Sequence, residues 1–147
     1  MRQLALFTIL CLSCLALIPV TTAATTQDRQ FVKNYLIDYG YLEQQHTRQN
    51  FKRSLRQFQR ENNIDASGRI TPELLQFIAD RTLVINYLQT FNYLKRGEKS
   101  SSSIVLALKQ LQTNSGVLSI TEVIDAPTIN FVKTNSQGFS EPILINS

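Results

Sequence analysis

The sequence has little of the side-chain chemistry that most enzymes and metal sites use. It contains two cysteines, Cys11 and Cys14, and one histidine, His46. Zinc sites usually take three or four His, Cys or carboxylate ligands, so we predict no metal site, no cofactor and no catalytic residue. The five glycines are scattered, which argues against a glycine-rich phosphate loop. We expect His46 in a loop or at a helix end.

The first 23 residues have the pattern of a secretory signal peptide. One positive side chain, Arg2, precedes an uncharged apolar run from Leu4 to Val20, and small residues follow. A retained anchor helix is the alternative, but the run is a little short for the roughly 20 apolar residues of a spanning helix. We expect cleavage after Ala23 or Ala24 and a secreted, extracellular protein with no membrane segment after cleavage. Both cysteines would leave with the signal, so no disulfide is expected.

Three blocks of sequence occur twice, in the same order and at offsets of 52, 53 and 54 residues. The pairs are NYLIDYGYL at 34–42 with NYLQTFNYL at 86–94, LRQFQ at 55–59 with LKQLQ at 108–112, and ITPELLQFI at 70–78 with IDAPTINFV at 124–132. Order, spacing and residue type all agree, so we predict two copies of one unit. The predicted units are residues 29–81 and 82–138, with a flexible tail at 139–147.

Each unit is expected to form three short helices, which makes the protein all-α with two three-helix units packed together. Thr71 and Pro72 suit the start of one helix, and Gly40 suits the end of another. Ser101 to Ser103 are expected just before a helix, and Asp125 is expected to cap the last one. Apolar residues at helical spacing are expected to face the core: Phe31, Val32, Tyr35, Leu36, Tyr39, Phe51, Leu55, Phe58, Ile64, Leu74, Leu75, Phe77, Ile78, Ile104, Leu106, Leu108, Leu111, Ile129, Phe131 and Val132.

No glycine or proline interrupts the sequence between Pro72 and Leu94. The last helix of the first unit is therefore expected to continue into the first helix of the second unit, because these two residue types are the usual helix breakers. Such a continuous helix would join the two units into one rigid body without a disulfide.

The order of the blocks resembles the peptidoglycan-binding-like domain family, in the form found as the propeptide of matrix metalloproteinases. YLxxYGYL, LRQFQ and GRITPELLQFI carry the resemblance in the first unit, and the second unit repeats it, so that it covers nearly all of the chain after residue 23. Asp125, Thr128 and Val132 are similar to the end of such propeptides. The resemblance implies a module that binds a partner.

In those propeptides the last helix is followed by Pro-Arg-Cys-Gly-Val-Pro-Asp, whose cysteine thiolate occupies the catalytic zinc. Here Ser136 and Gln137 stand where that segment has Arg and Cys, while Gly138 and the acidic Glu141 are kept. An amide oxygen is a poor zinc ligand compared with a thiolate, so this switch segment is expected to be degenerate. The sequence contains no H-E-x-x-H metalloproteinase helix, and we predict that the protein is not an enzyme.

A basic stripe, which we define as Lys52, Arg53, Arg56 and Arg60, is predicted on one helix. Lys52, Arg56 and Arg60 share a helical face at a spacing of four residues. The stripe is either a solvated outer face or a contact for an anionic partner such as an acidic glycan. Four aromatic residues either stack on sugars or pack in the core: Tyr39, Tyr41, Phe91 and Tyr93.

Two functions are compatible with these features. The first is a secreted, non-catalytic binding protein whose partner is an extracellular glycan, and it requires the basic stripe or exposed tyrosines. The second is a regulator or inhibitor that docks on a separate matrix metalloproteinase catalytic domain, and it requires the tail from Ser136 to Glu141. That tail is otherwise an ordinary surface terminus. We predict no nucleic-acid partner, because the protein is expected to be secreted, and the sequence leaves the oligomeric state undefined.

Overall fold

The computed structural model describes residues 24–136 of the chain, and this part consists of helices and loops with no strand. The helices are α1 (Thr26–Asp38), α2 (Arg48–Glu61), α3 (Pro72–Thr90), α4 (Ser101–Ser115) and α5 (Ala126–Asn135). The all-α prediction is therefore confirmed. None of these helices has the length and apolar character needed to cross a bilayer. The predicted signal peptide and tail lie outside the described residues.

Two of the predicted helix starts are confirmed. Thr71 accepts a hydrogen bond from the backbone N–H of Leu74 at 3.3 Å, with a proline in the first turn of α3. Asp125 accepts from the backbone N–H of Thr128 at 2.9 Å at the start of α5. Each cap satisfies an amide that has no partner inside the helix.

Two other helix starts differ from the prediction. Thr25 and Asp28 cap α1 reciprocally, each side chain accepting from the other's backbone N–H. The first helix thus begins before residue 29, the predicted start of the first unit. The cap of α4 is Ser100, whose hydroxyl accepts from the N–H of Ser103. The serines predicted to precede α4 therefore form its first turn.

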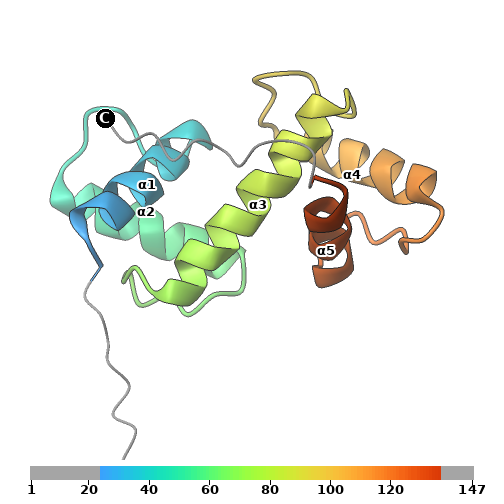
Figure 1. Cartoon of the computed structure of the whole chain (residues 1–147). Coiled ribbons are helices and arrows are strands. Elements are labelled where there is room, and N and C mark those ends of the chain that lie inside the picture. The colour runs from blue at the N-terminus through green and yellow to red at the C-terminus, as the bar shows by residue number, and fades with distance from the viewer. Residues whose placement is uncertain (1–23, 137–147) are drawn as a thin grey trace, which may run out of the picture.

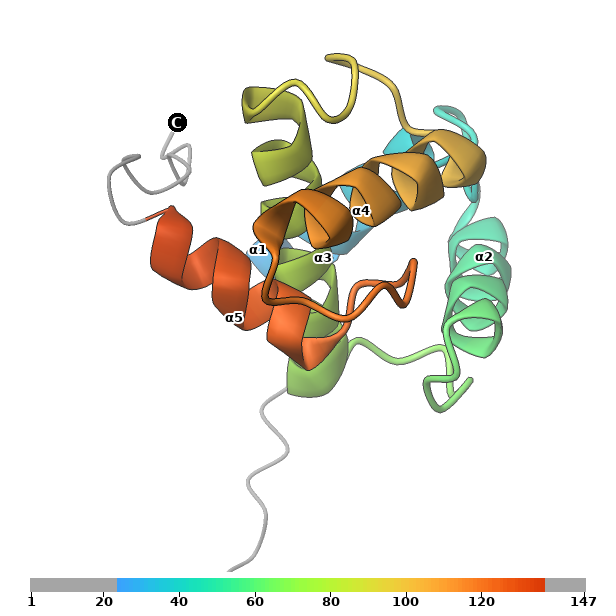
Figure 2. The ribbon, with the colours of Figure 1, turned by 90° about the vertical axis from the view of Figure 1, so that its right-hand side faces the viewer.

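Helix α3 connects the two halves of the molecule. Figure 1 shows α1 and α2 on one side of α3, and α4 and α5 on the other. The helix crosses the predicted boundary between residues 81 and 82 without a break, as the lack of glycine and proline predicts. In Figure 2, α4 and α5 both lie against α3. The halves therefore share a rigid element.

The buried side chains form two hydrophobic clusters, one in each half. The first contains Val32, Tyr35, Leu36, Leu42, Leu55, Phe58, Leu74 and Ile78. The second contains Val84, Ile85, Leu88, Leu94, Ile104, Ala107, Leu108, Leu111 and Val132. Tyr39 packs against both clusters, so they meet at the end of α1.

The core prediction was wrong for two side chains. Phe31 is 39% exposed and Leu106 is 62% exposed. Leu106 follows Ile104 by two positions, a rotation of about 200° that turns it to the opposite side of α4. Phe31 lies at the edge of the buried face of α1, one position before the fully buried Val32.

The ends of α1 and α3 are built alike. Gly40 and Asn92, which the sequence repeat aligns, have positive φ angles of 75° and 60°. Two residues later, the N–H groups of Leu42 and Leu94 donate to carbonyls six residues earlier, at 3.1 and 3.0 Å. This closing turn returns each leucine to its core. These matching contacts support the prediction of two copies of one unit, which otherwise stays a prediction.

Candidate binding site beside helix α2

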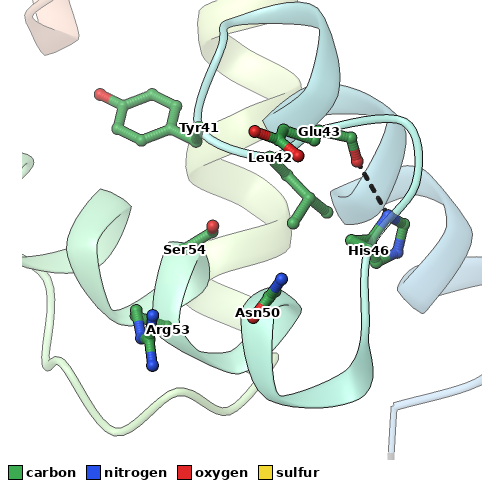
Figure 3. Close-up of a pocket in the computed structure, with 7 residues that line it drawn as sticks. All are labelled: Tyr41, Leu42, Glu43, His46, Asn50, Arg53 and Ser54. Carbon is green, nitrogen blue, oxygen red and sulfur yellow. Dashed lines mark hydrogen bonds between the residues drawn. The ribbon is translucent and has the colours of Figure 1, made fainter.

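A surface pocket of about 210 Å³ lies between the α1–α2 loop and the first half of α2 (Figure 3). Its lining residues are Tyr41, Leu42, Glu43, His46, Asn50, Arg53 and Ser54. The lining therefore combines one aromatic ring and one apolar side chain with a carboxylate, an imidazole, an amide, a guanidinium and a hydroxyl group. Such a mixture is suited to a polar ligand that is held by hydrogen bonds and by contact with a ring.

The start of α2 positions three of these residues. Thr47 caps the helix by accepting from the backbone N–H of Asn50 at 3.2 Å. Asn50, Arg53 and Ser54 then follow at positions i, i+3 and i+4, which lie on one helical face. Because that face carries amide, guanidinium and hydroxyl groups, it supplies hydrogen-bond donors and acceptors to the pocket.

His46 lies in the loop before α2, which confirms its predicted place. Its Nδ1 atom is 2.9 Å from the carbonyl oxygen of Glu43 and 3.2 Å from that of Gln44, and Figure 3 shows the first contact. Carbonyl oxygens only accept, so Nδ1 carries a hydrogen and donates it. The loop thereby holds the ring at one side of the pocket. Between residues 24 and 136, no three His, Cys, Asp or Glu side chains are grouped as metal ligands.

All four side chains of the basic stripe are exposed. In the part of the chain that the structure describes, none of them forms an ion pair. Lys52 and Arg56 lie along the α2–α3 loop, since a Cβ added at Gly68 would lie 3.0–3.1 Å from their side-chain atoms. Arg53 alone among the four lines the pocket. The structure thus places the stripe next to the pocket but does not bring all four residues into it.

A buried glutamine, Gln59, fixes the loop beside the stripe, and it is not among the predicted site residues. Its side chain accepts from the N–H of Gly68 at 2.9 Å and donates to the carbonyl of Arg69 at 3.0 Å. Gln112 holds the α4–α5 loop in the same way. The sequence feature that could have indicated this role is the final glutamine shared by the repeated blocks LRQFQ and LKQLQ, at the end of an otherwise apolar face.

The four candidate aromatics pack mainly within the protein. Tyr39, Tyr41 and Tyr93 are half-buried, whereas Phe91 is 40% exposed and its ring centre lies 4.3 Å from that of Tyr87. Tyr41 is the member of this group that also lines the pocket. It is therefore the aromatic residue best placed to contact a ligand there.

The hydroxyl of Tyr41 is held in its neutral form. Burial raises the pKa of Tyr41, and the hydrogen bond to Glu61 raises it further. Hydrogen bonds from Gln57 and from Tyr41 lower the pKa of Glu61. At neutral pH the phenol therefore donates to a carboxylate, which fixes the ring at the edge of the pocket.

One residue of the predicted degenerate switch segment is described. Ser136 caps the C-terminus of α5, and its N–H donates to the carbonyl of Val132 at 2.8 Å. Gln137, Gly138 and Glu141 lie outside the described residues. The degenerate switch therefore stays a prediction.

Comparison with known proteins finds a family match for one segment of the chain. Residues 25–78 match the model described as "Putative peptidoglycan binding domain", a span that contains α1, α2, the pocket and the basic stripe. Over 61 residues, 42% of each chain, the protein is 49% identical to "Uncharacterized protein 114L" of Invertebrate iridescent virus 3. It thus spans less than half of that relative's length. No solved structure gives a significant match.

The resemblance to the peptidoglycan-binding-like domain is therefore confirmed at residues 25–78, while the metalloproteinase-propeptide form and the second copy stay predictions.

Proposed function

We propose that this chain is a secreted, non-catalytic protein that binds a glycan polymer of the peptidoglycan class through the pocket beside α2. One observation carries the proposal. All residues that line the pocket fall between positions 41 and 54, inside the segment that matches a family described by binding. The segment that resembles a glycan-binding module thus contains a polar surface pocket.

The size and lining of the pocket favour one unit of a polymer. Its volume of about 210 Å³ is below the roughly 300 Å³ at which pockets for whole drug-sized ligands begin. The ring of Tyr41 offers a face for a sugar, and Asn50 and Ser54 offer hydrogen bonds. Glu43 and Arg53 carry opposite charges, which suits a polymer that bears both amino and carboxylate groups. The basic stripe then continues along α2 for further anionic groups.

The proposal is tested by sedimentation of the full chain with purified insoluble peptidoglycan, with cellulose as a polymer without peptide or charge. We expect a salt-sensitive bound fraction on peptidoglycan and little on cellulose. The double substitution Asn50→Ala, Arg53→Gln removes two polar pocket contacts. It should weaken binding about tenfold or more, because a hydrogen bond to a charged group contributes roughly 1.5–3 kcal/mol.

The matched control is Arg96→Gln, which removes one exposed positive charge from the loop before α4. It should bind like the unmodified protein. The proposal would be contradicted if the protein bound cellulose as well as peptidoglycan, or if Arg96→Gln weakened peptidoglycan binding as much as the double substitution does. The metalloproteinase alternative has its own assay, inhibition of a matrix metalloproteinase catalytic domain cleaving a peptide. Inhibition that Gln137→Ala abolishes would favour that alternative.

A further inference from the structure

A second, smaller cavity lies where the two halves of the molecule meet. Its volume is about 60 Å³. The polar residues that line it include Tyr35, Tyr39, Tyr41, Arg81, Lys99 and Ser101. They come from α1, the loop after α1, the middle of α3, the α3–α4 loop and the start of α4. Neither half of the molecule forms this cavity alone.

Arg81 is a half-buried cation, and no ion pair involves it within residues 24–136. Among the described residues, no Asp or Glu oxygen lies within 4.0 Å of its guanidinium nitrogens. It makes a side-chain hydrogen bond with Tyr35. Partial burial of a charge beside a neutral hydroxyl costs free energy, and an anion bound there would offset that cost.

The two nearby carboxylates have other partners than Arg81. Lys99 Nζ lies 3.1 Å from Asp38 Oδ2 and 5.6 Å from the centre of the Tyr39 ring. Asp38 therefore balances Lys99, and Glu61 is hydrogen-bonded to Tyr41 and Gln57. The charged side chains that line the cavity itself, Arg81 and Lys99, are both positive.

Two of the tyrosines, Tyr35 and Tyr39, can act as donors in this cavity, whereas the hydroxyl of Tyr41 already donates to Glu61. Burial raises the pKa of Tyr35, Tyr39 and Tyr41, and the nearby positive charge of Arg81 opposes that rise in all three. Because the net shift is upward, the phenols remain protonated at neutral pH. Arg81 is close enough to influence every one of them, so guanidinium and hydroxyl groups converge on the same small volume.

We propose that this cavity binds a single small oxyanion group, a carboxylate or a phosphate, through the guanidinium of Arg81. The planar fork of an arginine pairs with two oxygens of such a group at once, and tyrosine hydroxyls provide additional hydrogen bonds. A volume of about 60 Å³ accepts one group of this size but not a sugar ring. The anion would contact both halves of the molecule and hold them together.

This anion site is independent of the proposed glycan pocket. The two cavities share Tyr41 alone, and the anion site uses residues beyond the segment that matches the family model. Binding at the anion site can be measured with simple salts, in the absence of any polymer. A failure of peptidoglycan binding would therefore leave the anion site standing, and the reverse also holds.

The test is a nuclear magnetic resonance titration of the ¹⁵N-labelled full chain with sodium phosphate and, separately, with sodium acetate. Sodium chloride keeps the ionic strength constant, because screening alone changes exposed charges. We expect saturable shifts, with at least one of the two salts, at the Arg81 side chain and at the amides around Tyr39–Tyr41 and Lys99–Ser101. The salt that saturates at lower concentration identifies the preferred oxyanion.

Arg81→Gln should weaken that binding about tenfold or more, since it removes a charged bidentate donor. Arg96→Gln is the control of equal charge and should leave it unchanged. If circular dichroism shows that Arg81→Gln does not fold, Lys99→Gln replaces it, because Lys99 is partly exposed and its loss should weaken binding severalfold. Three results would each overturn the proposal: shifts that do not saturate, shifts centred on the basic stripe, or unchanged affinity for the salt in the variant that folds.

Discussion

At the scale of single residues, two buried glutamines define the loops that follow α2 and α4. Gln59 makes two side-chain hydrogen bonds to its loop. Gln112 makes five: its Oε1 accepts from two backbone N–H groups, and its Nε2 lies within 3.2 Å of three acceptors. Both side chains are 1% exposed. Each glutamine thus replaces backbone pairing for a loop that has no strand partner.

We predict that Gln112→Met lowers the free energy of unfolding by roughly 2–4 kcal/mol, because each buried polar group that loses its hydrogen-bond partner costs about 1–3 kcal/mol. Gln59→Met should cost less, since fewer partners lose their bond. The measurement is urea unfolding followed by circular dichroism. Gln110→Met, at an exposed position of α4, is the control and should change stability by less than about 0.5 kcal/mol. An equal effect of all three substitutions would contradict this role.

At the scale of secondary-structure elements, α3 contributes side chains to both hydrophobic clusters. Leu74 and Ile78 belong to the first cluster, and Val84, Ile85 and Leu88 belong to the second. Between these groups, Asp80 pairs with Lys133 of α5 at 2.7 Å. A partly exposed pair of this kind adds little stability, so the continuous helix and its packing are the main connection.

We predict that Ala79→Pro destabilises both halves together, by about 3 kcal/mol or more, because proline in a helix interior removes a hydrogen bond and clashes with the preceding turn. Ala79 is exposed, so the substitution does not alter core packing directly. Hydrogen exchange, read residue by residue, is the measurement. Ala79→Gly is the milder control and should cost about 1 kcal/mol. Lost protection in one half alone would show that the two halves fold independently.

At the scale of the whole molecule, the two halves differ in surface chemistry. The first half carries the basic stripe on α2. The α4–α5 loop of the second half instead exposes Val117, Ile120 and Val123, at 77%, 55% and 56%. Tyrosines gather between the halves, where Tyr35 and Tyr39 stack with ring centres 4.4 Å apart. The junction is therefore the place where ionisation of a side chain would affect both halves.

We predict that alkaline pH destabilises the protein through this junction. Burial raises the pKa of Tyr35 above its usual value, and Arg81 opposes the rise only in part. An acid whose folded pKa is raised contributes stability that is present below the unfolded pKa, near 10 for tyrosine, and is lost as pH rises further. From pH 10 upward the free energy of unfolding should fall by up to about 1.4 kcal/mol per pH unit for this group.

Urea unfolding between pH 8 and pH 11 measures this dependence. Tyr35→Phe should be less stable near pH 8, where it lacks the bond to Arg81, and should decline less steeply above pH 10. Identical slopes for the two proteins would exclude Tyr35 as a source of the alkaline loss.

Much of the fold could be predicted from the sequence because it depends on local chemistry. Thr71 and Asp125 satisfy free amides at helix starts, and Gly40 adopts a left-handed conformation that glycine allows at little cost. The lack of helix breakers after Pro72 predicted the continuous α3. The cap at Thr25 could not be predicted from helical periodicity, because the apolar period of α1 begins only at Phe31.

The sequence by itself determined the helices, the caps at Thr71 and Asp125, the absence of thiol chemistry after residue 23 and the basic stripe, since each depends on residues close together along the chain. Only the tertiary structure decided what those residues face. It placed Arg53 at a pocket and Lys52 along a loop, although both belong to one helix. It also brought Arg81 to three tyrosines that lie about 40 residues earlier, because α3 folds back against α1. Contacts over such separations depend on the packing of helices, which helical periodicity does not specify.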